Sequence, residues 1–164
     1  MYEKICPTKI SRKFSRVNFG FTLIELLVVA SILIILSGIG IASYNQFNRR
    51  KILDKATQEL KSNLRLTQGK ALAGEKPVGC TGLLGHKLIF TTNQNYKIVA
   101  VCGSGEIPIK TDLALDQNVF KIGEPDEIFF KGLASGVENE GTITLSFPDV
   151  GQTTITVTAT GGIE

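Results

Sequence analysis

Three patterns of apolar and polar residues follow one another along the chain. Between Phe19 and Arg49 the only charged residue is Glu25, and most of the others are apolar. This stretch exceeds the ~20 residues that a helix needs to cross a bilayer, so it predicts one membrane-spanning segment. A carboxylate inside such a segment costs roughly 2.5–3.5 kcal/mol on insertion scales, so Glu25 needs a functional explanation.

The second pattern is that of an amphipathic helix. An apolar residue recurs every four positions, at Ile52, Ala56, Leu60 and Leu64. We expect the other faces to carry the polar residues, which are Asp54, Lys55, Gln58, Glu59, Lys61 and Asn63. Gly74 and Pro77 supply a stop. The sequence therefore predicts one helix from 21 to about 73, with a transmembrane half over 21–45 and an amphipathic half within 46–74.

After Pro77 the spacing of apolar residues changes to two, and Val, Ile, Thr and Phe become frequent. Seven strands are expected, over residues 87–92, 96–102, 106–110, 118–122, 127–131, 142–147 and 153–160. The first two and the last two are close enough to form hairpins. The pattern predicts an α+β fold, with the long N-terminal helix packed on an antiparallel, β-sandwich-like domain over 75–164.

The charges orient the chain in a membrane. Residues 1–20 hold five basic side chains against Glu3, a net charge of +4, so the remainder carries −1 of the overall +3. Positive charge before the span predicts a cytoplasmic N-terminus and an extracytoplasmic 75–164 domain, although three basic residues at 49–51 oppose this orientation. Because the basic character belongs to residues 1–20, we expect no nucleic-acid partner.

Two cleavage points are open to such a chain. An ordinary secretory signal is cut after its apolar region at a small-x-small site, and residues 42–44 match that pattern only loosely. The other point precedes the apolar run, between Gly20 and Phe21 in NFGFTLIELL. Cutting after the span discards the anchor, whereas cutting at Gly20 keeps it and exposes a new amine on Phe21.

The stretch GFTLIELLVVASILIIL closely resembles the processing motif of type IV prepilins and type II secretion pseudopilins. The resemblance covers about residues 16–45. It implies that residues 1–20 are a leader, that a prepilin peptidase cuts after Gly20, and that the new amine of Phe21 is methylated. It also implies that Glu25 helps the subunit leave the inner-membrane lipid and join other pilin or pseudopilin subunits on an inner-membrane assembly platform.

Helix geometry gives Glu25 a physical role in that assembly. In one helix, Phe21 and Glu25 lie on the same face, about 6 Å apart along the axis. A neighbouring helix displaced by about that rise would set its own Phe21 amine against the Glu25 carboxylate, and pairing is how buried charges are tolerated. Glu25 would then fix the register between subunits. The alternative is an incidental charge near the membrane surface.

The β-rich part resembles the pseudopilin H and FimT-like branch in the stretch IFFKGLASGVENEGTITLSF, and the helix end ALAGEKPV fits the same branch. A tryptophan expected in a strand of that branch is absent, because the chain has no Trp. The resemblance implies a minor pseudopilin that assembles into a type II secretion pseudopilus for protein export. The alternative is a minor type IV pilin that acts in pilus assembly or DNA uptake.

The cysteines indicate one further feature. Cys6 lies in the leader, whereas Cys80 and Cys102 lie in the domain that the predicted topology places in an oxidising compartment. We therefore expect Cys80 and Cys102 to form a disulfide, with two unpaired thiols as the alternative.

The remaining polar residues indicate no catalytic chemistry. His86, the single histidine, is expected to be a polar loop residue at the start of a strand. Glu124, Asp126 and Glu127 are expected to form an acidic, solvated turn, with a calcium site as the alternative. No zinc spacing, nucleotide-binding fingerprint or nucleophile motif occurs. The sequence predicts no enzyme, no cofactor and no metal site.

Overall fold

The computed structural model describes residues 20–133 and 136–164, apart from the side chains of residues 38–42. The chain divides into two compact units, Met1–Ile41 and Ala42–Glu164. A helix followed by antiparallel β-sheets confirms the predicted α+β fold. Of the leader predicted over 1–20, only Gly20 is among the described residues. The two glycines of SGIGIAS, at 38 and 40, belong to the stretch 38–42 whose surroundings are not described.

Helix α1 (Leu23–Ala73) ends at the glycine that the sequence marks as a stop. Gly74 has a φ of 62°, which a glycine adopts without strain. The Gly74 N–H donates to the Ala71 carbonyl oxygen at 3.1 Å, and the Glu75 N–H donates to the Lys70 carbonyl oxygen at 3.1 Å. These two bonds form a Schellman motif, which satisfies carbonyl groups left unpaired at a helix end.

Within the second unit, one face of α1 is buried. Its buried apolar side chains recur every three to seven residues, at Leu53, Ala56, Leu60, Leu64 and Ala71. The predicted stripe drifts because the helical period is 3.6 rather than 4, so Ile52 is only partly buried. Asn63, predicted on a polar face, is only 6% exposed. Its Nδ2 donates to the Tyr96 hydroxyl oxygen at 2.8 Å, which supplies the partner that a buried amide needs.

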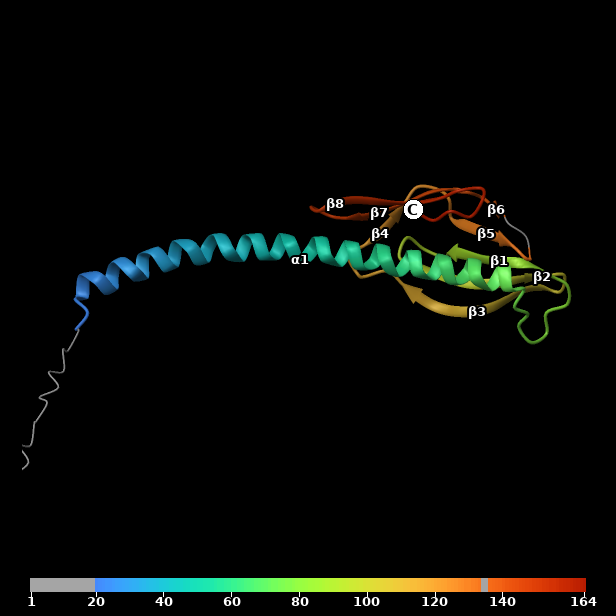
Figure 1. Cartoon of the computed structure of the whole chain (residues 1–164), viewed down its shortest axis with the longest axis horizontal. Coiled ribbons are helices and arrows are strands. Elements are labelled where there is room, and N and C mark those ends of the chain that lie inside the picture. Colours follow the sequence, from blue (N-terminus) through green and yellow to red (C-terminus); the bar gives the residue numbers. More distant parts are fainter. Residues whose placement is uncertain (1–19, 134–135) are drawn as a thin grey trace, which may run out of the picture. The chain divides into compact units, whose positions relative to one another are not determined.

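In the described part of the chain, α1 is followed by eight strands: β1 (Leu83–Phe90), β2 (Asn95–Cys102), β3 (Gly105–Ala114), β4 (Phe120–Ile122), β5 (Glu127–Lys131), β6 (Val137–Glu138), β7 (Gly141–Phe147) and β8 (Gly151–Val157). They form a five-stranded sheet in the order β3-β2-β1-β5-β6 and a three-stranded sheet in the order β4-β7-β8. Every pairing is antiparallel. Figure 1 shows these strands beside the C-terminal part of α1.

Both predicted hairpins are present, β1 with β2 and β7 with β8. The two-residue strand β6 was not predicted, and β1 begins at Leu83 rather than at residue 87. The earlier start includes Gly85, where a Cβ atom would lie only 2.2 Å from the Phe130 carbonyl oxygen. Glycine here therefore permits close approach of β5 to β1, and is not a turn signal.

The hydrophobic core draws on α1 and on both sheets. Its fully buried members include Leu60, Leu64, Leu88, Ile98, Ile128, Ile143, Leu145 and Ile155. Because residues from both sheets and the helix share one cluster, the second unit has a single core. This is the arrangement of layers that buries one face of each element.

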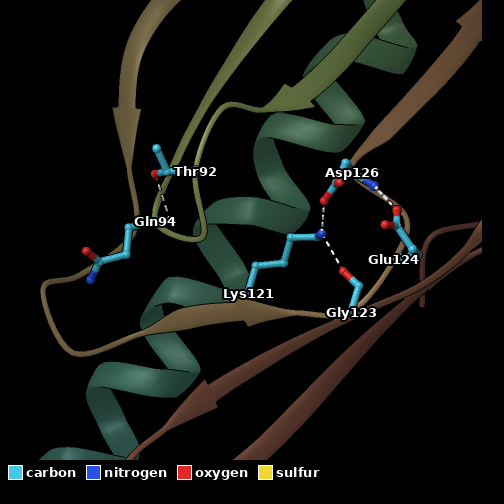
Figure 2. Close-up of polar contacts among 6 residues, drawn as sticks. All are labelled: Thr92, Gln94, Lys121, Gly123, Glu124 and Asp126. Carbon is cyan, nitrogen blue, oxygen red and sulfur yellow. Dashed lines mark hydrogen bonds and ion pairs between the residues drawn. The ribbon is translucent and has the colours of Figure 1, made fainter.

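Lys121 of β4 links the two sheets. Its side chain is only 4% exposed. The amine pairs with the carboxylate of Asp126, the residue before β5, and donates to the Gly123 carbonyl oxygen, as Figure 2 shows. A buried amine requires such partners, because desolvating an unpaired charge is costly.

The acidic residues between β4 and β5 lie in an exposed turn, as the sequence predicts: Glu124 and Asp126 are exposed, and Glu127, the first residue of β5, is partly exposed. Asp126 pairs with Lys121, and Glu127 pairs with Lys87 at 3.1 Å. Glu124 accepts a hydrogen bond from the Asp126 backbone N–H at 3.1 Å. The ion pairs with Lys121 and Lys87 add partners that the sequence analysis did not include. Among the described residues, no group of three His, Cys, Asp or Glu side chains is placed to hold a metal ion.

Candidate processing and assembly site

The candidate site begins at the three residues that precede α1. Gly20, Phe21 and Thr22 adopt neither helix nor strand, and all three are exposed. A Cβ atom added to Gly20 would meet none of the described atoms within 4 Å. Packing within the described chain therefore does not explain a glycine here.

Thr22 caps the start of α1. Its Oγ1 accepts a hydrogen bond from the Glu25 backbone N–H at 3.2 Å, and its carbonyl oxygen accepts one from the Leu26 N–H at 3.2 Å. Thr22 is thus the N-cap residue and Glu25 is the third helical residue, the spacing of a capping box. The cap holds the Gly20–Phe21 peptide bond outside the helix.

Glu25 lies in the first turn of α1 and is exposed. A negative charge there is favoured by the helix dipole. Among the described residues, the bonds recorded for Glu25 involve its backbone and not its carboxylate. The helix begins at Leu23 rather than at 21, so Phe21 lies before the helix and does not share a helix face with Glu25. Glu25 instead bonds through its backbone N–H to the cap residue Thr22.

A continuous apolar surface follows Glu25. Its large side chains are between 49% and 73% exposed: Leu26, Leu27, Val28, Val29, Ile32, Leu33, Ile34, Ile35 and Leu36. An apolar surface of this extent marks contact with a membrane or a protein partner. Within the part of the chain that the structure describes, no helix is assigned as long and apolar enough to cross a membrane. The span predicted over 21–45 includes residues 38–42, whose side chains lie outside that part.

The predicted cysteine pair lies in the second unit. Cys80 and Cys102 form a disulfide with their Cα atoms 5.6 Å apart. It joins the loop after α1 to the end of β2. The structure therefore gives Cys80 and Cys102 a role within the β-rich unit and groups Gly20, Phe21 and Glu25 in the first unit.

Two residues were missed or misassigned by sequence reasoning. The cap Thr22 could have been found, because TLIE reads as Thr-x-x-Glu before an apolar run. His86, predicted in a loop, instead lies inside β1 and is 0% exposed.

Comparison with known proteins supports the assignment of the N-terminal segment. The family model for the prokaryotic N-terminal methylation motif matches residues 15–41. No curated protein and no solved structure matches the chain. The motif is the signal of type IV pilins and pseudopilins, and it indicates a pilin-like or pseudopilin subunit. It implies processing by a prepilin peptidase and assembly with other pilin subunits, and it suggests membrane anchoring through the N-terminal helix.

Proposed function

We propose that this chain is a minor pseudopilin that assembles into a type II secretion pseudopilus for protein export. The observation that carries the proposal is the methylation motif over residues 15–41, which opens a helix with an exposed apolar surface. The resemblance of residues 128–147 to the pseudopilin H and FimT-like branch favours this role. The α+β body, with its own core, is a structural module that the filament would carry.

Processing converts the chain into an assembly-competent subunit. A prepilin peptidase cuts between Gly20 and Phe21 and methylates the amine of Phe21. The exposed, non-helical backbone at Gly20 supports this step, because a peptidase needs an accessible and extended substrate. The leader lies in the cytoplasm, residues 21–45 cross the inner membrane once, and residues 75–164 lie outside the cytoplasm, where the Cys80–Cys102 disulfide is stable.

Glu25 then selects assembly over the isolated membrane-bound state. In lipid a lone carboxylate costs roughly 2.5–3.5 kcal/mol on insertion scales. The Phe21 amine of a neighbouring subunit relieves that cost, and the relief favours filament entry at one axial register. Among the described residues no side chain of the same chain takes this place, which supports an external partner.

Two measurements test this function. Intact mass of the mature chain is expected to begin at methylated Phe21, and a chain that retains residues 1–20 would contradict processing. Glu25→Ala is expected to insert in the membrane normally but to enter filaments at least about tenfold less, as measured by co-purification with the major subunit. Asp54→Ala is the matched control, because Asp54 is an exposed acidic residue further along the same helix. Normal incorporation of Glu25→Ala would contradict the register role.

A minor type IV pilin, active in pilus assembly or DNA uptake, is the second candidate. The methylation motif supports it equally, because the motif serves both kinds of filament. Deleting the gene separates the two: the pseudopilin role predicts a loss of protein export with pili retained. A DNA-uptake role predicts salt-sensitive DNA binding, which the net charge of −1 outside the leader disfavours.

A further inference from the structure

The charges of the second unit are divided between its helix and its strands. Residues 49–70, which lie in α1, hold seven basic and two acidic side chains, a net charge of +5. Residues 74–164, which follow the helix, hold six basic and eleven acidic side chains, a net charge of −5. The small net charge outside the leader therefore conceals two regions of opposite sign. Charge of one sign on an exposed surface selects partners by complementarity.

The exposed side of this part of α1 forms a regular stripe. Its members are four and three residues apart in turn, which is the spacing that keeps side chains on one face of a helix. We call it the basic stripe, and it consists of Lys51, Lys55, Gln58, Ser62, Arg65 and Gly69, all of which are exposed. It holds three cations and no acid, and it extends for about 27 Å along the helix axis.

The basic stripe lies on the side of α1 that the sheets leave uncovered. Leu60 and Leu64 are fully buried and mark the side of the helix that faces the core. Ser62 is two residues from each of them, so it is rotated by about 160° from both at 3.6 residues per turn. Among the described residues, Lys51, Lys55 and Arg65 take part in no ion pair. Their charges are therefore available to a partner outside the described chain.

The length of the basic stripe decides between a lipid surface and a protein. The headgroup layer on one side of a bilayer is about 5–8 Å thick. Lys51 and Arg65 lie about 21 Å apart along the axis of α1, a distance that exceeds this layer even in a helix tilted by about 40°. Phospholipid headgroups can therefore reach one end of the stripe but not its whole length.

The residues in and beside the stripe favour a protein helix over a nucleic acid. Ser62 and Gly69 are small, and small residues at a helix surface permit close approach of a second helix. Asp54 and Glu59 are exposed on the two borders of the stripe and would repel phosphate groups. The net charge of −5 on residues 74–164 adds to that repulsion. A second copy of this chain is disfavoured, because aligned copies would set cations against cations.

We propose that the basic stripe binds the aligned helix of a different pilin-like subunit, which carries carboxylates at the same spacing of three or four residues. The proposal rests on the proposed function, because membership of one filament is what aligns the two helices. It gives a role to cations that have no ion pair in the described chain. It also keeps this chain from packing on itself through the stripe, as suits a minor subunit.

A photo-crosslinking side chain in the middle of the stripe identifies the partner. We place p-benzoylphenylalanine at position 62 of the full chain, in cells that build the filament, and sequence the linked peptides by mass spectrometry. Links are expected to the helix of a different pilin-like subunit, within one turn of a carboxylate. The same group at position 154, where Thr154 is exposed on β8, is the control and is expected not to label that helix. Links to a second copy, to lipid or to nucleic acid, or no links in chains that have entered filaments, would overturn the proposal.

Charge reversal measures what the stripe contributes. Lys55→Glu combined with Arg65→Glu is expected to lower entry into filaments at least about tenfold, as measured by co-purification with the linked subunit. Lys76→Glu combined with Lys97→Glu is the matched control, because it changes the net charge equally but outside the stripe. Lysine in place of the linked carboxylates of the partner is expected to restore entry of the reversed chain. Equal entry of the two double variants, or no restoration, would overturn the proposal.

The same variants separate a failure of this proposal from a failure of the proposed function. Lys55 and Arg65 are exposed, so the reversed chain is expected to fold and to be cut and methylated as the wild type is. If it also supports export as the wild type does, the role of the stripe is wrong and the proposed function stands. A wild-type chain that keeps residues 1–20 would end both.

Discussion

Large apolar side chains of α1 are exposed in the first unit and buried in the second. In the first unit Leu27 is 60% exposed and Ile34 is 73% exposed, whereas in the second unit Leu60 and Leu64 are fully buried. All four lie on one helix, α1. The second half of α1 contributes to a core that the strands of the second unit complete. Residues 26–36 thus carry an exposed apolar surface that the described chain does not cover.

Polar groups repeat this contrast. In the second unit the buried Lys121 amine meets the Asp126 carboxylate, and the buried Asn63 amide meets the Tyr96 hydroxyl. In the first unit, the described residues supply no such partner to the Glu25 carboxylate. Lys121 and Asn63 thus find their partners within the second unit, whereas Glu25 is exposed.

The largest effect on this comparison is expected from shortening a leucine in each unit. Leu64→Ala opens a cavity in a closed core and is expected to lower the free energy of unfolding of the second unit by roughly 2–5 kcal/mol. Leu27→Ala removes exposed atoms and is expected to change that free energy by less than about 0.5 kcal/mol. Chemical denaturation in micelles measures both. A similar loss of free energy of unfolding in the two variants would contradict the contrast between a buried Leu64 and an exposed Leu27.

Removing the disulfide is expected to affect the second unit alone. Cys80 and Cys102 are separated by 22 residues, so loss of the bridge is expected to lower the free energy of unfolding by about 3 kcal/mol in the chain-entropy model. Denaturation of the Cys80→Ser, Cys102→Ser double variant measures this loss. Hydrogen exchange of residues 23–36 serves as the control and is expected to stay unchanged. A change in those amides would show that the two units are coupled.

The smallest effect is expected at the helix cap. Thr22→Ala removes the Oγ1 acceptor and is expected to destabilise the start of α1 by about 1 kcal/mol, whereas Thr22→Ser keeps an acceptor and should behave as wild type. Exchange of the amides of residues 23–26 measures this fraying. Equal protection in all three chains would argue that the helix start is held by its surroundings and not by the cap.

Features with a local cause could be predicted from the sequence. The helix stop at Gly74 and the two hairpins depend on neighbouring residues, and the structure has them. The methylation motif is also local, so residues 16–45 were sufficient to indicate a pilin-like subunit. The capping relation between Thr22 and Glu25 has an equally local signal, although it was overlooked.

Features with a distant cause were missed. Asn63 is polar by composition, but Tyr96, 33 residues later, makes its burial tolerable. His86 was expected to be a polar loop residue because it is a lone histidine, whereas the pairing of β1 with β2 and β5 buries it. In both cases the partner comes from an element that is distant in sequence.

Zero-length cross-linking of filaments tests the pairing of Glu25 most directly. Activation of the carboxyl group allows the Phe21 amine to form an amide with it, with loss of one water, only where the two groups touch. Filaments built from mixed light and nitrogen-15 chains distinguish links between chains from links within one. We expect Phe21–Glu25 links that join light to heavy peptides, and none in Glu25→Gln. Links only within one chain, or no links in intact filaments, would contradict the account.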